Sequence, residues 1–125
     1  MRAAFRGRAT ESGGILGMCD GIVCRFAFDA GSADTGEYIP DTDRLNRLLE
    51  EWYREGVAFC GMVHTHIGGC RALSREDTES IRAIYRAMQK ECLYFPIATF
   101  DGEEMALSVY RIDGNGIREE TLDIV

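Results

Sequence analysis

The chain has 125 residues, of which 46% are hydrophobic, and its 21 acidic side chains outnumber its 14 lysines and arginines, which gives a formal net charge of -7. This size and composition predict a single domain over residues 1–125 with one hydrophobic core, in which residues 1–10 form a short lead-in. The acidic balance disfavours nucleic acid as a partner, and the lack of a long apolar run disfavours a membrane.

The first half of the chain predicts a hairpin, a helix and a strand. Two strand-like runs, 14–19 and 21–28, meet at Asp20-Gly21, a dipeptide that suits the positive φ angles of a tight turn. Apolar residues then recur at helical spacing between cap residues at 40–43 and Gly56. Residues 57–66 alternate as a central strand, on which one face is expected to carry Ala58, Cys60, Met62, His64 and His66.

The second half predicts a helix followed by three strands. Ser74 can cap the helix, whose buried side carries apolar residues between 81 and 88. Strands are expected over 93–100, 105–113 and 117–125, separated by turn residues. The order ββαβαβββ predicts a mixed sheet between helices.

The five cysteines predict reduced thiols. Their number is odd and no CxxC pair is present, a pattern more typical of small buried residues than of a disulfide framework: Cys19, Cys24, Cys60, Cys70 and Cys92. The basic N-terminus also lacks the apolar region of a secretory signal. Both observations predict a cytoplasmic location.

The two histidines of the chain stand two residues apart, at His64 and His66. On a strand their imidazoles project from the same face, close enough to share one cation. Asp77, in the first turn of the second helix, can supply a third ligand. Two histidines and one carboxylate leave the fourth position of a zinc ion open to water, which is typical of catalytic zinc sites.

Two further residues complete a candidate reaction. Glu11 precedes Gly13-Gly14, where the backbone can bring its carboxylate near the metal as a general base for a zinc-bound water. Ser74 can donate to the oxyanion of a tetrahedral intermediate. Each feature also has a structural explanation: Ser74 and Asp77 can form a helix cap, the histidines can be hydrogen-bonded core residues, and Glu11 can be solvated.

Taken together, these residues resemble the signature of the JAMM (JAB/MPN) metalloproteases. The signature is a distant glutamate, then HxH, seven residues, serine, two residues and aspartate, and this sequence has Glu11, His64-Thr65-His66, Ser74 and Asp77 in that arrangement. The segment 11–17, ESGGILG, is similar to the family's entry segment. Residues 38–41 and Trp52-Tyr53 resemble its prokaryotic branch.

The resemblance implies both a fold and an activity. The fold would be an α/β/α sandwich with a mixed sheet, similar to cytidine deaminases. The activity would be that of a zinc-dependent metallopeptidase or isopeptidase that hydrolyses a peptide or isopeptide bond by glutamate-assisted attack of a zinc-bound water. One Zn²⁺ per chain would be held by His64, His66 and Asp77, with Glu11 as base and Ser74 as oxyanion donor. The partner would be a protein or peptide, with the C-terminus of a ubiquitin-like protein as one candidate.

The sequence departs from the family at three points. Ile67 stands where the family commonly has proline. Family members usually carry a longer segment before the glutamate, but only ten residues precede Glu11, which predicts an exposed sheet edge that a homodimer would cover. The short connection from Met88 to Leu93 leaves no room for the insertion that holds ubiquitin in eukaryotic relatives. As a separate hypothesis, Cys70 in the loop after His66 could reach the open metal position. Two other functions stay open: a non-catalytic scaffold or protein-binding module of the same family, and a RadC-like protein associated with DNA.

Overall fold

The computed structural model describes residues 11–30, 41–66, 71–101 and 104–120. These residues form two helices and six strands in the predicted order: β1 (Gly13–Cys19), β2 (Ile22–Asp29), α2 (Thr42–Arg54), β3 (Ala58–Thr65), α3 (Arg75–Met88), β4 (Cys92–Asp101), β5 (Glu104–Asp113) and β6 (Gly116–Glu119). Residues 1–10, 38–40 and 121–125, together with Ile67 and Cys70, lie outside the described residues, so the expectations that rest on them stay predictions.

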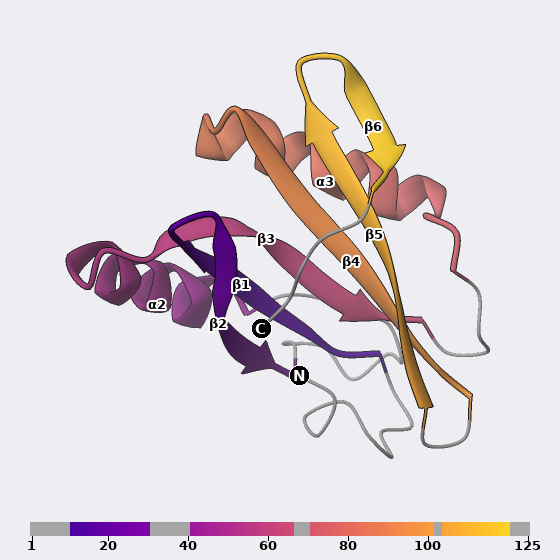
Figure 1. Cartoon of the computed structure of the whole chain (residues 1–125), viewed down its shortest axis with the longest axis horizontal. Coiled ribbons are helices and arrows are strands. Elements are labelled where there is room, and N and C mark those ends of the chain that lie inside the picture. Colours follow the sequence, from indigo (N-terminus) through magenta and orange to yellow (C-terminus); the bar gives the residue numbers. More distant parts are fainter. Residues whose placement is uncertain (1–10, 31–40, 67–70, 102–103, 121–125) are drawn as a thin grey trace.

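All six strands belong to one sheet, in the order β2-β1-β3-β4-β5-β6. Strands β3 and β4 are parallel, whereas each of the other neighbouring pairs is antiparallel, so the predicted mixed sheet is confirmed. The strands twist strongly from one edge to the other, and the sheet curls into a half-barrel (Figure 1).

The predicted α/β/α sandwich, of the JAB/MPN and cytidine-deaminase type, is wrong. Strand β1 is antiparallel to both β2 and β3, so β2, β3 and β4 all point the same way. The chain crosses from β2 to β3 and from β3 to β4 in one direction across the sheet. Because such crossovers are right-handed, successive helices fall on the same face. The described part of the chain is mostly β, with two short helices rather than a layer on each face.

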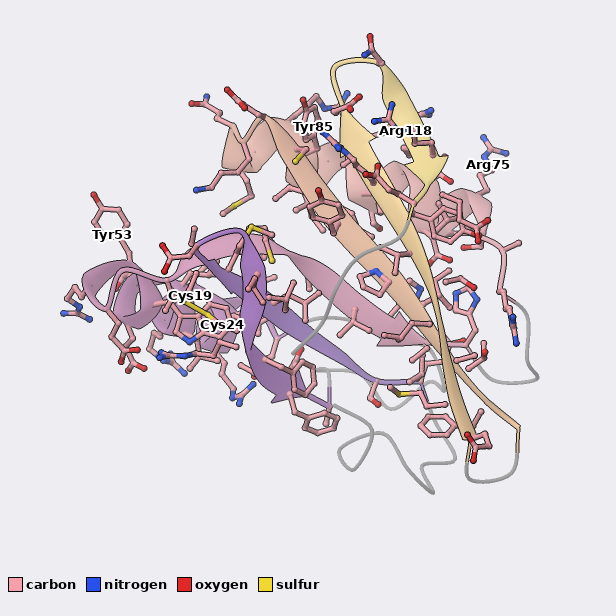
Figure 2. The ribbon with its side chains drawn as sticks, in the orientation of Figure 1. Cys19, Cys24, Tyr53, Arg75, Tyr85 and Arg118 are labelled. Carbon is pink, nitrogen blue, oxygen red and sulfur yellow. A yellow bond between two sulfur atoms is a disulfide. The ribbon has the colours of Figure 1, made fainter. Side chains whose placement is uncertain are left out.

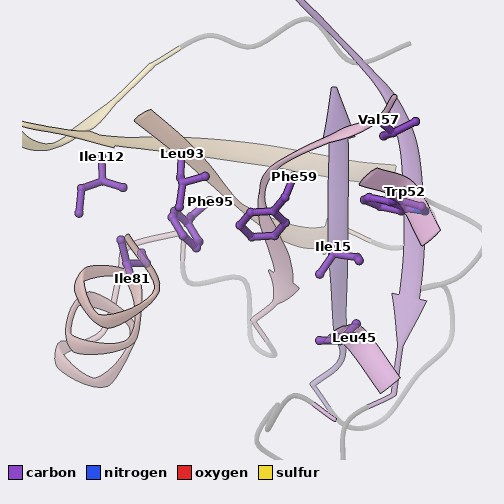
Figure 3. Close-up of a cluster of buried hydrophobic side chains, with 9 residues drawn as sticks. All are labelled: Ile15, Leu45, Trp52, Val57, Phe59, Ile81, Leu93, Phe95 and Ile112. Carbon is purple, nitrogen blue, oxygen red and sulfur yellow. The ribbon is translucent and has the colours of Figure 1, made fainter. Parts of the chain in front are cut away.

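The hydrophobic core confirms this one-sided arrangement. Figure 3 shows the cluster between the sheet and the helices, in which Leu45 and Trp52 of α2 and Ile81 of α3 meet strand residues such as Phe59 and Phe95. A second cluster lies on the other face of the sheet. Its buried members among the described residues come from strands alone: Leu16, Val23, Cys60, Val63 and Ala98. The curled sheet therefore packs apolar residues on both faces, while the described helices cover one.

Helix α2 follows the predicted pattern. Its N-cap is Asp41, whose carboxylate accepts a hydrogen bond from the backbone N–H of Arg44 at 3.3 Å. Trp52 is 4% exposed and packs in the core, whereas Tyr53 is 85% exposed and points into solvent (Figure 2). Gly56, with φ at +79°, follows the helix end. Among the described residues, neither helix is long and apolar enough to span a membrane.

The expectation of reduced cysteines is wrong for Cys19 and Cys24, which form a disulfide (Figure 2). The bond closes the β1–β2 hairpin, whose turn residues Asp20 and Gly21 have φ angles of +52° and +80°. Because this turn brings the two strand ends together, the Cα atoms of the cysteines lie 5.8 Å apart, within the usual range for a disulfide. Cys60 and Cys92 are free thiols.

Candidate metal centre

The two histidines lie at the carboxyl end of β3, on the face of the sheet that the helices cover. Since His64 and His66 are two residues apart in an extended chain, their side chains project from the same face. Their Nε2 atoms lie 2.9 Å apart, and the side chains are 15% and 11% exposed. The Nε2 atoms of the two imidazoles therefore point toward one position near the surface.

The alternation predicted for β3 holds only over this end of the strand. Gly17 of β1 pairs with Phe59 while the residue before it pairs with Gly61, so Cys60 is an extra residue that forms a bulge. Phe59 therefore packs on the helix side and Cys60 on the other face, the reverse of the prediction. The bulge requires glycine, because Gly61 has φ at +154° and a Cβ there would lie 1.6 Å from the carbonyl oxygen of Tyr94.

Asp77 reaches the histidines from the first turn of α3. Ser74 is the N-cap, and its side chain accepts a hydrogen bond from the backbone N–H of Asp77 at 3.0 Å. In return Asp77 Oδ2 accepts from the backbone N–H of Ser74 at 2.9 Å. The same Oδ2 lies 2.9 Å from His66 Nε2, and Oδ1 lies 3.2 Å from His64 Nε2. The helix cap thus fixes the carboxylate in front of both rings.

The surroundings of Asp77 keep its carboxyl group ionised. Burial would by itself raise the pKa of this group. The hydrogen bonds from His64 and from the Ser74 backbone outweigh burial, so the pKa of Asp77 falls well below its ordinary value. The site therefore offers a full negative charge at neutral pH.

The three side chains have the chemistry and spacing of a metal site. Their ligand atoms all lie within 4.8 Å of one another, and the group could hold a metal ion. Nitrogen and oxygen ligands lie about 2.0–2.2 Å from zinc, so two of them at a tetrahedral angle are about 3.3 Å apart, close to the separations found here. A neutral histidine has at most one proton to share at Nε2, so two facing Nε2 atoms and a carboxylate are best satisfied together by one cation.

Glu11 stands two residues before β1, which pairs with the strand that carries the histidines. Gly13 of β1 pairs with His64, and the backbone N–H of Thr65 donates to the carbonyl oxygen of Ser12 at 2.8 Å. If this register continued by two positions, Glu11 would lie opposite His66 and its side chain would start on the face that carries the imidazoles. The structure brings His64, His66 and Asp77 together, and the place of Glu11 beside them stays a prediction.

Ser74 is the N-cap of α3, because its hydroxyl oxygen accepts a hydrogen bond from the backbone N–H of Asp77. This bond uses the oxygen as an acceptor and does not use the hydroxyl proton. Ser74 is exposed. Its hydroxyl can therefore cap the helix and donate to a bound molecule at the same time.

Tyr110 of β5 supports the site without any signal in the sequence. Its hydroxyl donates to the carbonyl oxygen of Arg71 at 2.8 Å, across 39 residues of chain. Arg71 precedes Ser74, so this bond ties the segment before α3 to the sheet. A tyrosine within an alternating strand pattern is typical of ordinary packing, and only the fold shows which carbonyl its hydroxyl meets.

Comparison with solved structures supports the fold as described. A solution structure of a protein from Desulfitobacterium hafniense matches with a TM-score of 0.67 and 21% sequence identity, covering 99% of this chain and 81% of that one. A solution structure of a protein from Salinibacter ruber matches with a TM-score of 0.59 and 17% identity, covering 99% of this chain and 82% of that one. At these identities the likeness concerns the fold alone.

Comparison at the level of sequence is sparse. No family model matches this chain. The GTP-binding protein RHO1 of Candida albicans is 28% identical over 89 residues, which is 65% of this chain. This chain covers 42% of the length of that relative. The membership of a JAMM family that the motif implies therefore stays a prediction.

Proposed function

We propose that this chain is a zinc-dependent peptidase or isopeptidase in which His64, His66 and Asp77 hold the metal. The observation that carries the proposal is the convergence of two imidazole nitrogens and an ionised carboxylate within 4.8 Å, at the surface end of a central strand. A set of two histidines and one carboxylate leaves a coordination position for water or substrate, as catalytic rather than structural zinc sites do. When bound, zinc supplies Lewis acidity and a water that loses its proton near neutral pH.

The remaining roles fall to Glu11 and Ser74. The Glu11 carboxylate accepts a proton from the attacking water and passes it to the nitrogen of the leaving amine. The Ser74 hydroxyl donates to the oxygen on which negative charge develops. The substrate is a protein or peptide, and the C-terminal linkage of a ubiquitin-like protein is the first candidate to test.

Metal content and cleavage test this proposal together. Elemental analysis of the purified protein is expected to give zinc near one ion per chain, and His66→Ala is expected to remove it. A peptide library whose cleavage sites are read by mass spectrometry is expected to be cut by the wild-type protein. Cleavage should stop on chelation, return with zinc, and be absent in Glu11→Gln, which keeps its zinc.

Each other outcome contradicts a defined part of the proposal. A folded protein that binds no divalent metal would refute the metal site itself. Cleavage that is equal in Glu11→Gln and the wild type would refute the role of Glu11. Metal binding without cleavage of the library or of a ubiquitin-like fusion would refute the peptidase and favour a non-catalytic binding module.

The likeness to a GTP-binding protein does not include a P-loop. A P-loop needs the pattern G-x-x-x-x-G-K-[ST], whose lysine reaches the phosphates. The single lysine of this sequence, Lys90, stands between glutamine and glutamate. We therefore do not propose nucleotide binding.

The predicted cytoplasmic location and the predicted homodimer remain proposals. The Cys19–Cys24 disulfide argues against the cytoplasm, because disulfides are rare in that reducing compartment. Mass analysis of protein extracted with a thiol-blocking reagent shows whether Cys19 and Cys24 are oxidised or reduced in the cell. Analytical ultracentrifugation of the purified chain measures whether it forms a homodimer.

A further inference from the structure

We propose that Thr65, the middle residue of the His64-Thr65-His66 segment, is a positioning residue that sets Glu11 opposite the metal ligands. This inference deepens the proposed function and rests on it for the role of Glu11. The inference starts from hydrogen bonds that run in both directions between Ser12, just before β1, and Thr65, at the end of β3. The backbone N–H of Ser12 donates to Thr65 Oγ1 at 3.0 Å, and the Thr65 hydroxyl and backbone N–H lie 3.3 and 2.8 Å from the Ser12 carbonyl oxygen.

The Thr65 hydroxyl takes the place of one of the two hydrogen bonds that an antiparallel residue pair commonly makes. Two opposed residues in an antiparallel ladder commonly exchange two backbone hydrogen bonds. Here one backbone bond runs from Thr65 to Ser12, and the Thr65 side chain takes the Ser12 N–H. The Thr65 side chain thus extends the pairing of β1 and β3 by one position beyond Gly13, as far as the residue that adjoins Glu11.

Burial makes this link hard to replace by water. Ser12 is 2% exposed and Thr65 is 5% exposed. A buried backbone N–H that loses its acceptor destabilises the folded state by its full desolvation penalty, because no hydrogen bond then compensates for the lost contact with water. A substitution that removes the Thr65 hydroxyl is therefore expected to release the start of β1 rather than to leave it in place with a solvent partner.

The geometry separates this role from metal binding. Because successive side chains alternate along a strand, Thr65 points to the face opposite the two imidazoles and cannot act as a ligand. Its contact is instead with Ser12, the neighbour of Glu11. The register of β1 and β3, continued to Glu11, directs the Glu11 side chain to the imidazole face. Thr65 connects the segment that holds the metal to the segment that holds the base.

Ser12 supplies a matched control. Its own hydroxyl oxygen is buried and has no hydrogen-bond partner among the residues that the structure describes, whereas its backbone makes the link to Thr65. Ser12→Ala therefore removes a buried hydroxyl at the same place without breaking the link. Thr65→Val removes the linking hydroxyl at nearly constant shape, and Thr65→Ser restores it.

The test uses the full chain loaded with Co²⁺, whose pseudocontact shifts report how far each amide lies from the metal. In Thr65→Val we expect faster hydrogen exchange at the Ser12 amide and a changed shift for Glu11. Shifts at Ile81 in α3 and the metal content should stay as in the wild type. Thr65→Ser and Ser12→Ala should match the wild type in all measurements.

Kinetics provide the second measurement. Displacing a catalytic group by about 1 Å can cost about 10²-fold in rate, so Thr65→Val is expected to lower kcat on that scale with little change in KM. Should Thr65→Val fail to fold, Thr65→Ala removes the same hydroxyl and takes its place.

The outcomes that overturn the proposal differ from those that overturn the proposed function. If hydrogen exchange at the Ser12 amide and the pseudocontact shift of Glu11 are both unchanged in Thr65→Val, the link is refuted. Loss of metal in that variant would also refute the proposal, because Thr65 would then support the metal ligands rather than the base. A wild-type protein that binds no metal, or in which Glu11→Gln is fully active, would instead refute the proposed function and leave the Ser12 exchange result intact.

Discussion

Ser74 and Asp77 exchange two hydrogen bonds at the start of α3, and the Asp77 carboxylate that accepts one of them also faces His64 and His66. The same two residues thus form the helix cap and orient the charged member of the candidate metal site. The two explanations of the Ser-x-x-Asp pattern are therefore compatible, and substitutions can separate them.

Asp77→Asn should separate charge from capping. An asparagine oxygen can still accept from the Ser74 N–H, so we expect the free energy of unfolding to fall by less than about 1 kcal/mol, the scale of a charge at a helix N-terminus. Zinc affinity, measured by competition with a chromophoric chelator, should fall by more than about 100-fold because the anionic ligand is lost. Equal zinc affinity in the variant and the wild type would exclude Asp77 as a ligand.

Ser74→Ala should lower stability through the lost cap. Removal of a serine N-cap costs about 1 kcal/mol, and urea unfolding of the apo protein measures it. Ser74→Asp keeps a capping oxygen but has no hydroxyl proton, so it should restore stability without restoring kcat. Full activity in Ser74→Asp would show that the hydroxyl has no part in the reaction.

Gly61→Ala should be strongly destabilising. The new Cβ would meet the Tyr94 carbonyl oxygen at 1.6 Å, and φ at +154° is unfavourable for alanine. We expect a loss of about 3 kcal/mol in the free energy of unfolding, at the upper end of overpacking costs. Gly114→Ala is the control, because a Cβ there meets no atom of the described part of the chain within 4 Å and the residue is exposed. Similar stability in both variants would contradict the bulge in β3.

Reduction of the Cys19–Cys24 disulfide should lower stability. A cross-link that closes so short a loop is expected to contribute about 2 kcal/mol by restricting the unfolded chain. Urea unfolding with and without a reductant measures the difference. A Cys19→Ser, Cys24→Ser double variant should not respond to the reductant, and the tryptic peptide 9–25 of the oxidised wild type should be lighter by two hydrogens than its reduced form.

Cys60 should resist thiol reagents in the folded protein. Burial, with a smaller effect of Cys92, raises the pKa of the Cys60 thiol from 9.0 to about 12. Iodoacetamide at pH 9 should therefore modify Cys60 only after unfolding, with the half-buried Cys92 as the internal comparison. The unfolded chain releases this proton near pH 9 and the folded protein holds it to about pH 12, so stability from this group is lost as the pH rises through that interval.

The sequence by itself determined the features that depend on local periodicity. The two-residue repeat of a strand places His64 and His66 on one face, and the capping pattern places Asp77 in the first turn of a helix. The turn at Asp20-Gly21 follows from residues that accept positive φ. None of these features needs knowledge of a distant neighbour.

Only the tertiary structure decided what depends on pairing between distant segments. The bulge at Cys60 reverses the faces of the first residues of β3 because the pairing with β1 shifts its register. Gly61 permits this bulge, but a glycine alone does not say in which direction or by how much the register shifts. The order of strands decided that both described helices cover one face, and hairpin geometry brought Cys19 to Cys24. The pairing of Gly13 with His64 likewise follows from strand register, because alternation gives the face of a side chain but not the identity of its partner.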